Sequence, residues 1–324
     1  MPRSFAAAVP SNWAIAVALC IALALLPWFL SLYWLRILTD TLMLAIVAQG
    51  INIMAGFVGY PAFGNVVFFG IGAYGTAFAV SAHGYPMAAG IAFGAVAAAA
   101  LALTVGPLLL RLRGHYFAIA TLGLNEAVSA LVSNMTGVTG GSTGISLPLT
   151  KGSARDIAQE AYFCFMVLFG VGLLLTIALR SSRFGYGCRA IRANEEAAEA
   201  AGVDTLRIKI VAWTVSATIT AAAGGLYARW VGFIEPSLVF DMAISVKGFV
   251  MFLIGGVGTV FGPAVGAVLI QAITTLAWSY LLKVHLLVLG VVIMLVVLAM
   301  PNGVQSFVTQ RLRGALGRRG GPVR

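Results

Sequence analysis

Three glycines in the segment 68–77, FFGIGAYGTA, have the spacing of a dinucleotide-binding loop. Gly70, Gly72 and Gly75 match G-x-G-x-x-G, in which glycine permits a tight turn and a close approach of the backbone to a pyrophosphate. That chemistry also needs a preceding strand and an acidic residue about 20 positions further on. The first acidic residue after Gly75 is Glu126, and the surrounding apolar segment is as long as a membrane span. We therefore reject nucleotide binding at this motif.

The same glycines suit helix packing in a membrane, where small residues let neighbouring backbones approach closely. Gly72 with Thr76, and Ala73 with Ala77, are spaced i, i+4 and form small faces on one helix. Glycine lowers helix propensity by about 1 kcal/mol relative to alanine, which indicates a close neighbour or a pliable segment. We expect a packing face. A face that lines a substrate path is the alternative, and one face can serve both roles.

Two ionisable residues lie inside apolar segments. Glu126 is midway along 116–134, where a charge costs about 3 kcal/mol or more and normally faces a polar interior. Three roles are open to it: contact with the ammonium group of a substrate, an ion pair with Lys247, or a protonated state between helices. Asn125 points to another face. Lys247 is shallow in 242–262, so it is either an interfacial anchor with a snorkelling stem or a carboxylate contact in a path.

The other reactive residue types do not form a recognisable site. The three cysteines and three histidines are scattered, and no C-x-x-C occurs, so neither a disulfide framework nor a metal site is expected. No Ser-His-Asp set or carboxylate pair stands out, which argues against a membrane-embedded enzyme. The net charge of +10 is clustered beside apolar segments, which favours membrane topology over nucleic-acid binding.

The composition predicts an all-α polytopic membrane protein. Hydrophobic residues make up 60% of the chain and charged residues 9%, and no Asp, Glu, Lys or Arg occurs from Thr41 to Leu110. A span needs about 20 apolar residues. By that length we predict about ten spans, the first of them uncleaved: 13–33, 37–56, 58–82, 86–110, 116–134, 159–180, 208–229, 242–262, 263–282 and 284–300. The divisions near 57 and 262 are not marked by charge, and a short or re-entrant segment at either would change the count.

Positive charge predicts the orientation of these spans. Ten spans place both termini on one side, and that side collects the basic residues of four segments: Arg3, the turn 111–113, the loop 181–207 and the tail 311–324. The opposite side receives the loops 135–158 and 230–241. The excess of Lys and Arg makes the first side cytoplasmic. Arg36 falls on the wrong side and is the exception.

The loop 181–207 contains a short helix with its own start and stop signals. Asn194 can cap it, and Glu195 and Glu196 in its first turn suit the positive end of a helix. Alanines at 197, 198, 200 and 201 continue it, and Gly202 can end it in the left-handed conformation. We interpret the helix as either a solvated connector or a docking surface for a cytoplasmic partner.

The loop on the other side contains GVTGGSTGISLP at 137–148, rich in turn formers and hydroxyls. Its centre consists of Gly140, Gly141, Ser142, Thr143 and Gly144. Such a loop can gate an outer mouth, dock a soluble partner, or simply connect two helices.

Four stretches in this order resemble the permeases of branched-chain amino acid ABC transporters, in their LivM-like branch. They are GNVVFFGIGAYGTA, HYFAIATLGLNEAV leading to TGGSTGISLP, FGYGCRAIRANEEAAEAAGVDTLRIK with the span after it, and SVKGFVMFLIGGVGTVFGPAVGA. The resemblance as a whole extends over roughly residues 45–270. Family members often have Ser-Leu-Gly-His or Ser-Leu-Gly-Gln before the first stretch, where this chain has YPAFGN at 60–65, and TGG-[ST]-[DN]-G where it has Ser142 and Thr143. These departures bear on the solute and not on the family.

The resemblance implies a single permease domain over 1–310, with a basic cytoplasmic tail at 311–324, in a bacterial inner membrane. The partners would be a second homologous permease, two cytoplasmic ATPase subunits, a periplasmic substrate-binding protein and membrane lipid. ATP and Mg²⁺ would be bound by the ATPases, because this chain has no G-x-x-x-x-G-K-[ST]. We therefore expect that it binds no cofactor itself and is not an enzyme. Residues 190–204 would be the coupling helix, which touches an ATPase through Arg192, Asn194, Glu195, Glu196, Ala197, Ala198 and Gly202.

The expected solute is a branched-chain or related amino acid. Candidates for the translocation path are Asn65, Gly72, Tyr74, Glu126 and Lys247. Urea or a short amide is the alternative within the same architecture. An ion-coupled secondary transporter, with Glu126 as the ion site, is the alternative from another class.

Overall fold

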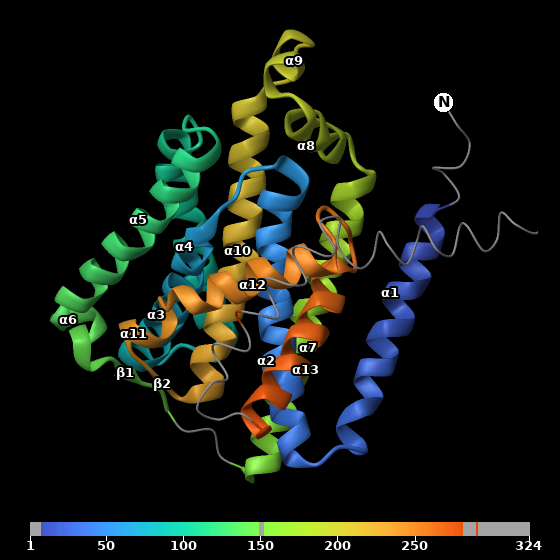
Figure 1. Ribbon diagram of the computed structural model, residues 1–324. Coiled ribbons are helices and arrows are strands. Elements are labelled where there is room, and N and C mark those ends of the chain that lie inside the picture. Colours follow the sequence, from blue (N-terminus) through green and yellow to red (C-terminus); the bar gives the residue numbers. More distant parts are fainter. Residues whose placement is uncertain (1–7, 149–151, 281–289, 291–324) are drawn as a thin grey trace, which may run out of the picture.

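The computed structural model describes residues 8–148, 152–280 and 290, and helices dominate this part of the chain (Figure 1). The α-helices are α1 (Ala8–Leu25), α2 (Leu32–Ile51), α3 (Val66–His83), α4 (Met87–Leu109), α5 (Gly114–Asn134), α6 (Thr136–Thr139), α7 (Ala154–Ser181), α8 (Arg183–Ala193), α9 (Glu195–Ala200), α10 (Thr205–Val231), α11 (Pro236–Val239), α12 (Met242–Gly255) and α13 (Gly262–Tyr280). The 3-10 turns are η1 (Leu26–Trp28), η3 (Phe63–Asn65) and η4 (Gly141–Thr143), and η2 (Asn52–Val58) has π-helical geometry. Two short strands, β1 (Ile145–Ser146) and β2 (Phe233–Ile234), pair in antiparallel fashion.

Seven helical stretches of the described chain are long and apolar enough to cross a membrane, which confirms a polytopic all-α protein. They are Leu32–Val58, Phe63–His83, Met87–Leu109, Gly114–Asn134, Ala154–Ser181, Thr205–Val231 and Pro236–Gly255. Two shorter apolar helices, Trp13–Trp28 and Gly262–Leu276, occupy the predicted first and ninth spans. The predicted tenth span, 284–300, and the tail 311–324 lie outside the described residues. The total of ten and a re-entrant segment stay predictions.

Some boundaries differ from those predicted, and glycine and proline explain the differences. The first apolar helix is shorter than 13–33 because a 3-10 turn that contains Pro27, Leu26–Trp28, follows Leu25. The predicted division near 57 falls in the π segment η2, which ends at Gly59 with φ +88°. The division predicted at 262 is a six-residue turn, because α12 already ends at Gly255 and Gly256 and Gly258 have positive φ.

Loops that were predicted to share a side do lie together (Figure 1). The turn between α4 and α5 meets α9 through an ion pair of Arg113 with Glu196 at 3.1 Å. At the other end, Ile145 of β1 pairs with Ile234 of β2. We call the first the basic end (residues 110–113 and 182–204) and the second the opposite end (135–148 and 232–241). Which end faces the cytoplasm stays a prediction from the positive charge.

Small residues join α3, α4 and α10 into one closely packed body. A Cβ atom on Gly72 would lie 1.9 Å from the carbonyl oxygen of Ala221 in α10, and one on Gly75 would lie 2.7 Å from the Cα atom of Gly94 in α4. Gly224 approaches the Phe69 backbone equally closely. The predicted packing face of α3 is therefore confirmed. The neighbouring α2 is buried throughout its second half and packs against α7, α10, α12 and α13.

Candidate functional site

The helix α9 forms at the basic end as its sequence predicts. The Asn194 side chain accepts a hydrogen bond from the backbone N–H of Ala197 at 3.0 Å, which satisfies one of the free donors of the first turn. Glu195 and Glu196 occupy that turn. Gly202 has φ +83°, a left-handed conformation that glycine adopts without strain. The cap, the acidic turn and the terminating glycine are all confirmed.

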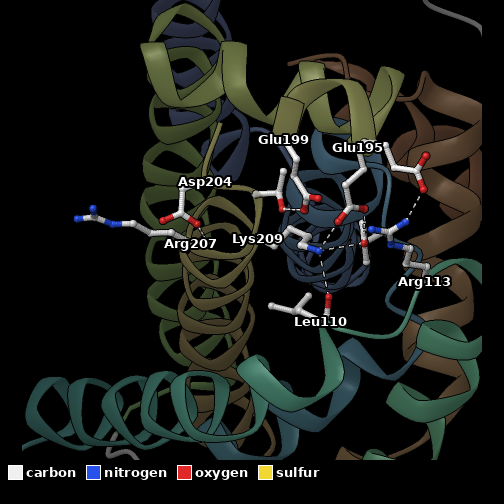
Figure 2. Close-up of polar contacts among 10 residues, drawn as sticks. Leu110, Arg113, Glu195, Glu199, Asp204, Arg207 and Lys209 are labelled. Atoms are coloured by element: carbon white, nitrogen blue, oxygen red, sulfur yellow. Dashed lines mark hydrogen bonds and ion pairs between the residues drawn. The ribbon is translucent and has the colours of Figure 1, made fainter. Parts of the chain in front are cut away.

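One carboxylate of α9 faces inward and is fully engaged (Figure 2). Lys209 of α10 donates to Glu195 Oε1 at 2.6 Å, and the hydroxyl of Tyr60 donates to Glu195 Oε2 at 2.6 Å. The ammonium group of Lys209 also donates to the carbonyl oxygen of Leu110 and to the hydroxyl oxygen of Tyr60, both at 3.1 Å. We call Tyr60, Leu110, Glu195 and Lys209 the Lys209 cluster. It joins α9, α10, the end of α4 and the loop that follows η2.

The Lys209 cluster contains a buried charge pair, Lys209 with Glu195. The side chains of Lys209 and Glu195 are 5% and 12% exposed. Such a pair is tolerated only when hydrogen bonds satisfy its charges, and here all three ammonium hydrogens have acceptors. Burial acts to raise the pKa of Glu195, but the hydrogen bonds from Lys209 and Tyr60 outweigh it and leave that pKa below its usual value. Burial, and then the hydrogen bond to Glu195, raise the pKa of Tyr60, which therefore stays a neutral donor.

The other side of α9 is open. Glu196 and Arg113 form an ion pair at 3.1 Å, but their side chains are 79% and 54% exposed, so the pair contributes little to stability. Ala197 and Ala200 are exposed beside Glu196, whereas Ala198 is buried. The residues predicted to touch an ATPase therefore divide into two groups. Glu195 and Ala198 face the body of the protein, and Glu196 and Ala197 face away from it.

Arg192, at the end of α8, makes a second connection to the body. Its guanidinium Nη1 donates to the carbonyl oxygen of Gly56 in the π segment η2. Asn52, in the same segment, donates to the Thr259 carbonyl oxygen at 2.8 Å and accepts from the Gly258 N–H at 2.9 Å. π-Helical segments are uncommon and often occur at functional positions. Here the segment links α8 to the turn between α12 and α13.

A family model described as "Branched-chain amino acid transport system / permease component" matches residues 33–297. The chain belongs to this permease family. The high-affinity branched-chain amino acid transport system permease protein LivM of Escherichia coli is 29% identical over 323 residues, which cover 92% of this chain and 76% of the relative. A probable LivM permease of Methanocaldococcus jannaschii is 26% identical, with 80% of this chain and 89% of the relative covered. The LivH permease of Escherichia coli is 28% identical over 188 residues, 55% of this chain and 60% of the relative. No solved structure matches.

Three predicted path residues of this permease lie in its packed interior. Asn65 donates to Thr220 Oγ1 at 2.9 Å and accepts from Ser216 Oγ at 3.2 Å, so it joins η3 to α10. Gly72 packs so closely against α10 that no space is left there for a side chain or a solute. The ring of Tyr74 stacks on Phe240 with centroids 6.1 Å apart, and its buried hydroxyl has no hydrogen-bond partner among the described residues. Of the three, Tyr74 alone keeps a free polar atom.

The two charged path candidates are not a pair. Glu126 is exposed on α5, so it does not face a polar interior within the described residues, and its place in a translocation path stays a prediction. Its neighbour Asn125 is the buried residue; it donates to the Phe240 carbonyl oxygen at 3.0 Å and also reaches Glu126 Oε1 at 3.4 Å. The ion pairs within the described residues do not include one between Glu126 and Lys247. Lys247 is half-buried and takes part in no ion pair within the described residues.

The predicted outer loop is held by its glycines and by the strand pair. Gly140, Gly141 and Gly144 all have positive φ, and a Cβ atom on Gly144 would lie 2.1 Å from the carbonyl oxygen of Ile234. Ser142 and Thr143 are exposed at the tip. The loop thus presents two hydroxyls on a defined backbone that is fastened to the residues after α10.

Sequence reasoning missed three polar residues of the permease. Lys209 falls at the start of the predicted span 208–229 but was not considered as a site residue; its apolar neighbours Ile208 and Ile210 were the signal that it belongs to a buried helix. Tyr60 was noted only as part of a departure from the family pattern. Asp40 was not considered, although it is the last charge before the uncharged segment from Thr41 to Leu110.

Proposed function

We propose that this chain is the membrane-spanning permease subunit of an ATP-driven importer for branched-chain amino acids. The match of residues 33–297 to the permease family supports the class of transport, and the names of the LivM and LivH relatives support the solute. They do not favour urea or a short amide. The exposed position of Glu126 offers no interior ion site, so we do not propose ion coupling.

The observation that carries the mechanism is the two-sided character of α9. Its outward face, with Glu196 and Ala197, is free to dock in a cytoplasmic ATPase subunit, while its inward face is tied to the body through Glu195 and Lys209. A displacement of α9 by the ATPase then moves α10, the end of α4 and the Tyr60 loop together. Arg192 carries the same displacement to η2 and to the turn after α12.

The remaining parts of the importer follow from this role. A second permease related to LivH would complete the path, two ATPase subunits would bind ATP and Mg²⁺ and hydrolyse the ATP, and a periplasmic binding protein would deliver the solute near the exposed Ser142 and Thr143. The complex would lie in a bacterial inner membrane with both termini of this chain in the cytoplasm. This chain would perform no catalysis.

The test is uptake of leucine by the importer reconstituted from all its subunits in liposomes. We expect Glu196→Lys, which reverses the charge of the outward face, and Gly202→Leu, which places a side chain at φ +83°, to lower ATP-driven uptake at least tenfold. Asp204→Asn is the matched control, because Asn also caps the helix that Asp204 caps. Unchanged uptake in both test variants would refute coupling through α9.

A further inference from the structure

A polar cavity lies at the opposite end of the permease, away from the Lys209 cluster. It has a volume of about 390 Å³ and is lined by Arg36 and Asp40 of α2, Ala154 and Ile157 of α7, and Trp230 of α10. That volume falls within the range of about 300–1,000 Å³ typical of small-molecule sites. Neither α9 nor the outer loop contributes to it, so it is distinct from the coupling site.

The charges around this cavity are held apart. Asp40 is half-buried and forms no hydrogen bond or ion pair within the described residues. The cation that lines the same cavity is Arg36, one turn earlier in α2, and it forms no ion pair with Asp40. A half-buried carboxylate normally forms an ion pair that offsets the cost of removing it from water. Asp40 forms no such pair within the described residues.

Neighbouring charges do not account for this arrangement. Arg229 and Glu160 connect α10 to α7 near the cavity, but they satisfy each other in an ion pair. Asp241 is engaged as the N-cap of α12 and accepts from the Ala243 N–H at 2.8 Å. Asp40 and Arg36 are the charged residues that line the cavity, and neither takes part in an ion pair within the described residues.

We infer that this cavity binds a free amino acid as a zwitterion, with its ammonium group on Asp40, its carboxylate on Arg36, and its apolar side chain against Ile157 and Trp230. A separated anion and cation with an apolar wall match the three groups of such a ligand. The cavity lies in the first turns of α2, on the side where the binding protein of the proposed importer releases its solute. The inference rests on the proposed function and assigns it a first solute site within the membrane subunit.

The test is protection of an engineered thiol in the assembled importer. Cys20, Cys164 and Cys188 are replaced by serine, Ile157→Cys serves as the reporter, and the complex is placed in nanodiscs made only of anionic lipid. We expect millimolar leucine to slow modification by a water-soluble thiol reagent at least threefold. 4-Methylpentanoate, which lacks the ammonium group, and isoamylamine, which lacks the carboxylate, should need at least tenfold higher concentrations. Ala154→Cys is a second reporter in case Ile157→Cys disturbs folding.

Asp40→Asn should abolish protection by leucine, and Asp241→Asn is the matched control, because asparagine keeps the cap of α12 while one acidic charge is lost at the same end. Absence of protection, equal protection by all three compounds, or full protection in Asp40→Asn would overturn the inference. The inference would also be overturned if the cysteine reporter reacted slowly without leucine in nanodiscs of phosphatidylethanolamine. The zwitterionic headgroup of the lipid would then be the bound ligand. Leucine uptake measured in parallel separates the two proposals. Uptake without protection refutes this site alone, whereas loss of leucine uptake in the parent importer refutes the proposed function.

Discussion

The two ends of this permease treat buried charge in opposite ways. At the basic end, Lys209 and Glu195 are in contact and every donor of the ammonium group has an acceptor. At the opposite end, Asp40 and Arg36 line the same cavity but do not form an ion pair. A closed network, in which every donor and acceptor is paired, can transmit a displacement between the elements it joins. In an open network, a charged group without an ion-pair partner can instead interact with a ligand.

The largest effect is expected where the closed network is broken. Lys209→Met would leave Glu195 with its charge largely buried and unpaired, which should lower the free energy of unfolding by roughly 3 kcal/mol. Thermal unfolding of the purified permease in detergent measures the loss. The double variant Lys209→Met with Glu195→Gln should recover at least half of it, because no buried charge is then left. A double variant as unstable as the single one would show that the pair does not act as a unit.

A smaller effect should appear as the pH is lowered. The pKa of Glu195 is lower in the folded protein than its unfolded value of about 4.3, so its stabilising contribution is complete above that value. It is lost as the pH falls through the lower, folded pKa. The difference in unfolding free energy between the parent permease and Glu195→Gln should therefore be constant above about pH 5 and shrink below about pH 4. A difference that already shrinks between pH 7 and 6 would contradict a stabilised carboxylate.

The smallest effect on stability is expected in the open network. Asp40→Asn removes a charge that has no partner, so the unfolding free energy should change by less than about 1 kcal/mol. Uptake of leucine by the reconstituted importer should nevertheless fall at least tenfold. Large destabilisation by Asp40→Asn would remove the contrast between the two ends, because it would give Asp40 a structural partner like that of Glu195.

Features that depend on residues close together in the sequence are predicted well, whereas contacts between residues far apart are not. The helix α9 is determined locally by Asn194, the acidic first turn and Gly202, and its prediction is confirmed in detail. The Lys209 cluster joins residues up to 149 positions apart, and no local pattern specifies such a contact. Glu126 is an intermediate case. Its depth in a span was readable from the sequence, but the side of α5 on which it lies depends on which neighbours pack there.

Arg36 shows that an exception to a sequence rule can be informative. Charge bias predicted the sides of the loops correctly relative to one another, and Arg36 was the residue that did not fit. Arg36 lines the cavity beside Asp40, and this position explains its place at the opposite end better than the charge bias does. Asp40 was missed because a single acidic residue at the edge of an apolar run is usually an interfacial charge.

The two-residue strand pair has a mechanical consequence. β2 begins two residues after α10 ends, and β1 fastens the outer loop to it, while Lys209 holds the other end of the same helix. With 27 residues, α10 is a rod about 40 Å long. If α10 pivots where it packs against α3 and α4, it acts as a rigid lever. Lys209 and the tip at Ser142 and Thr143 would then move in opposite directions, so a displacement at the basic end would reach the outer loop at the opposite end.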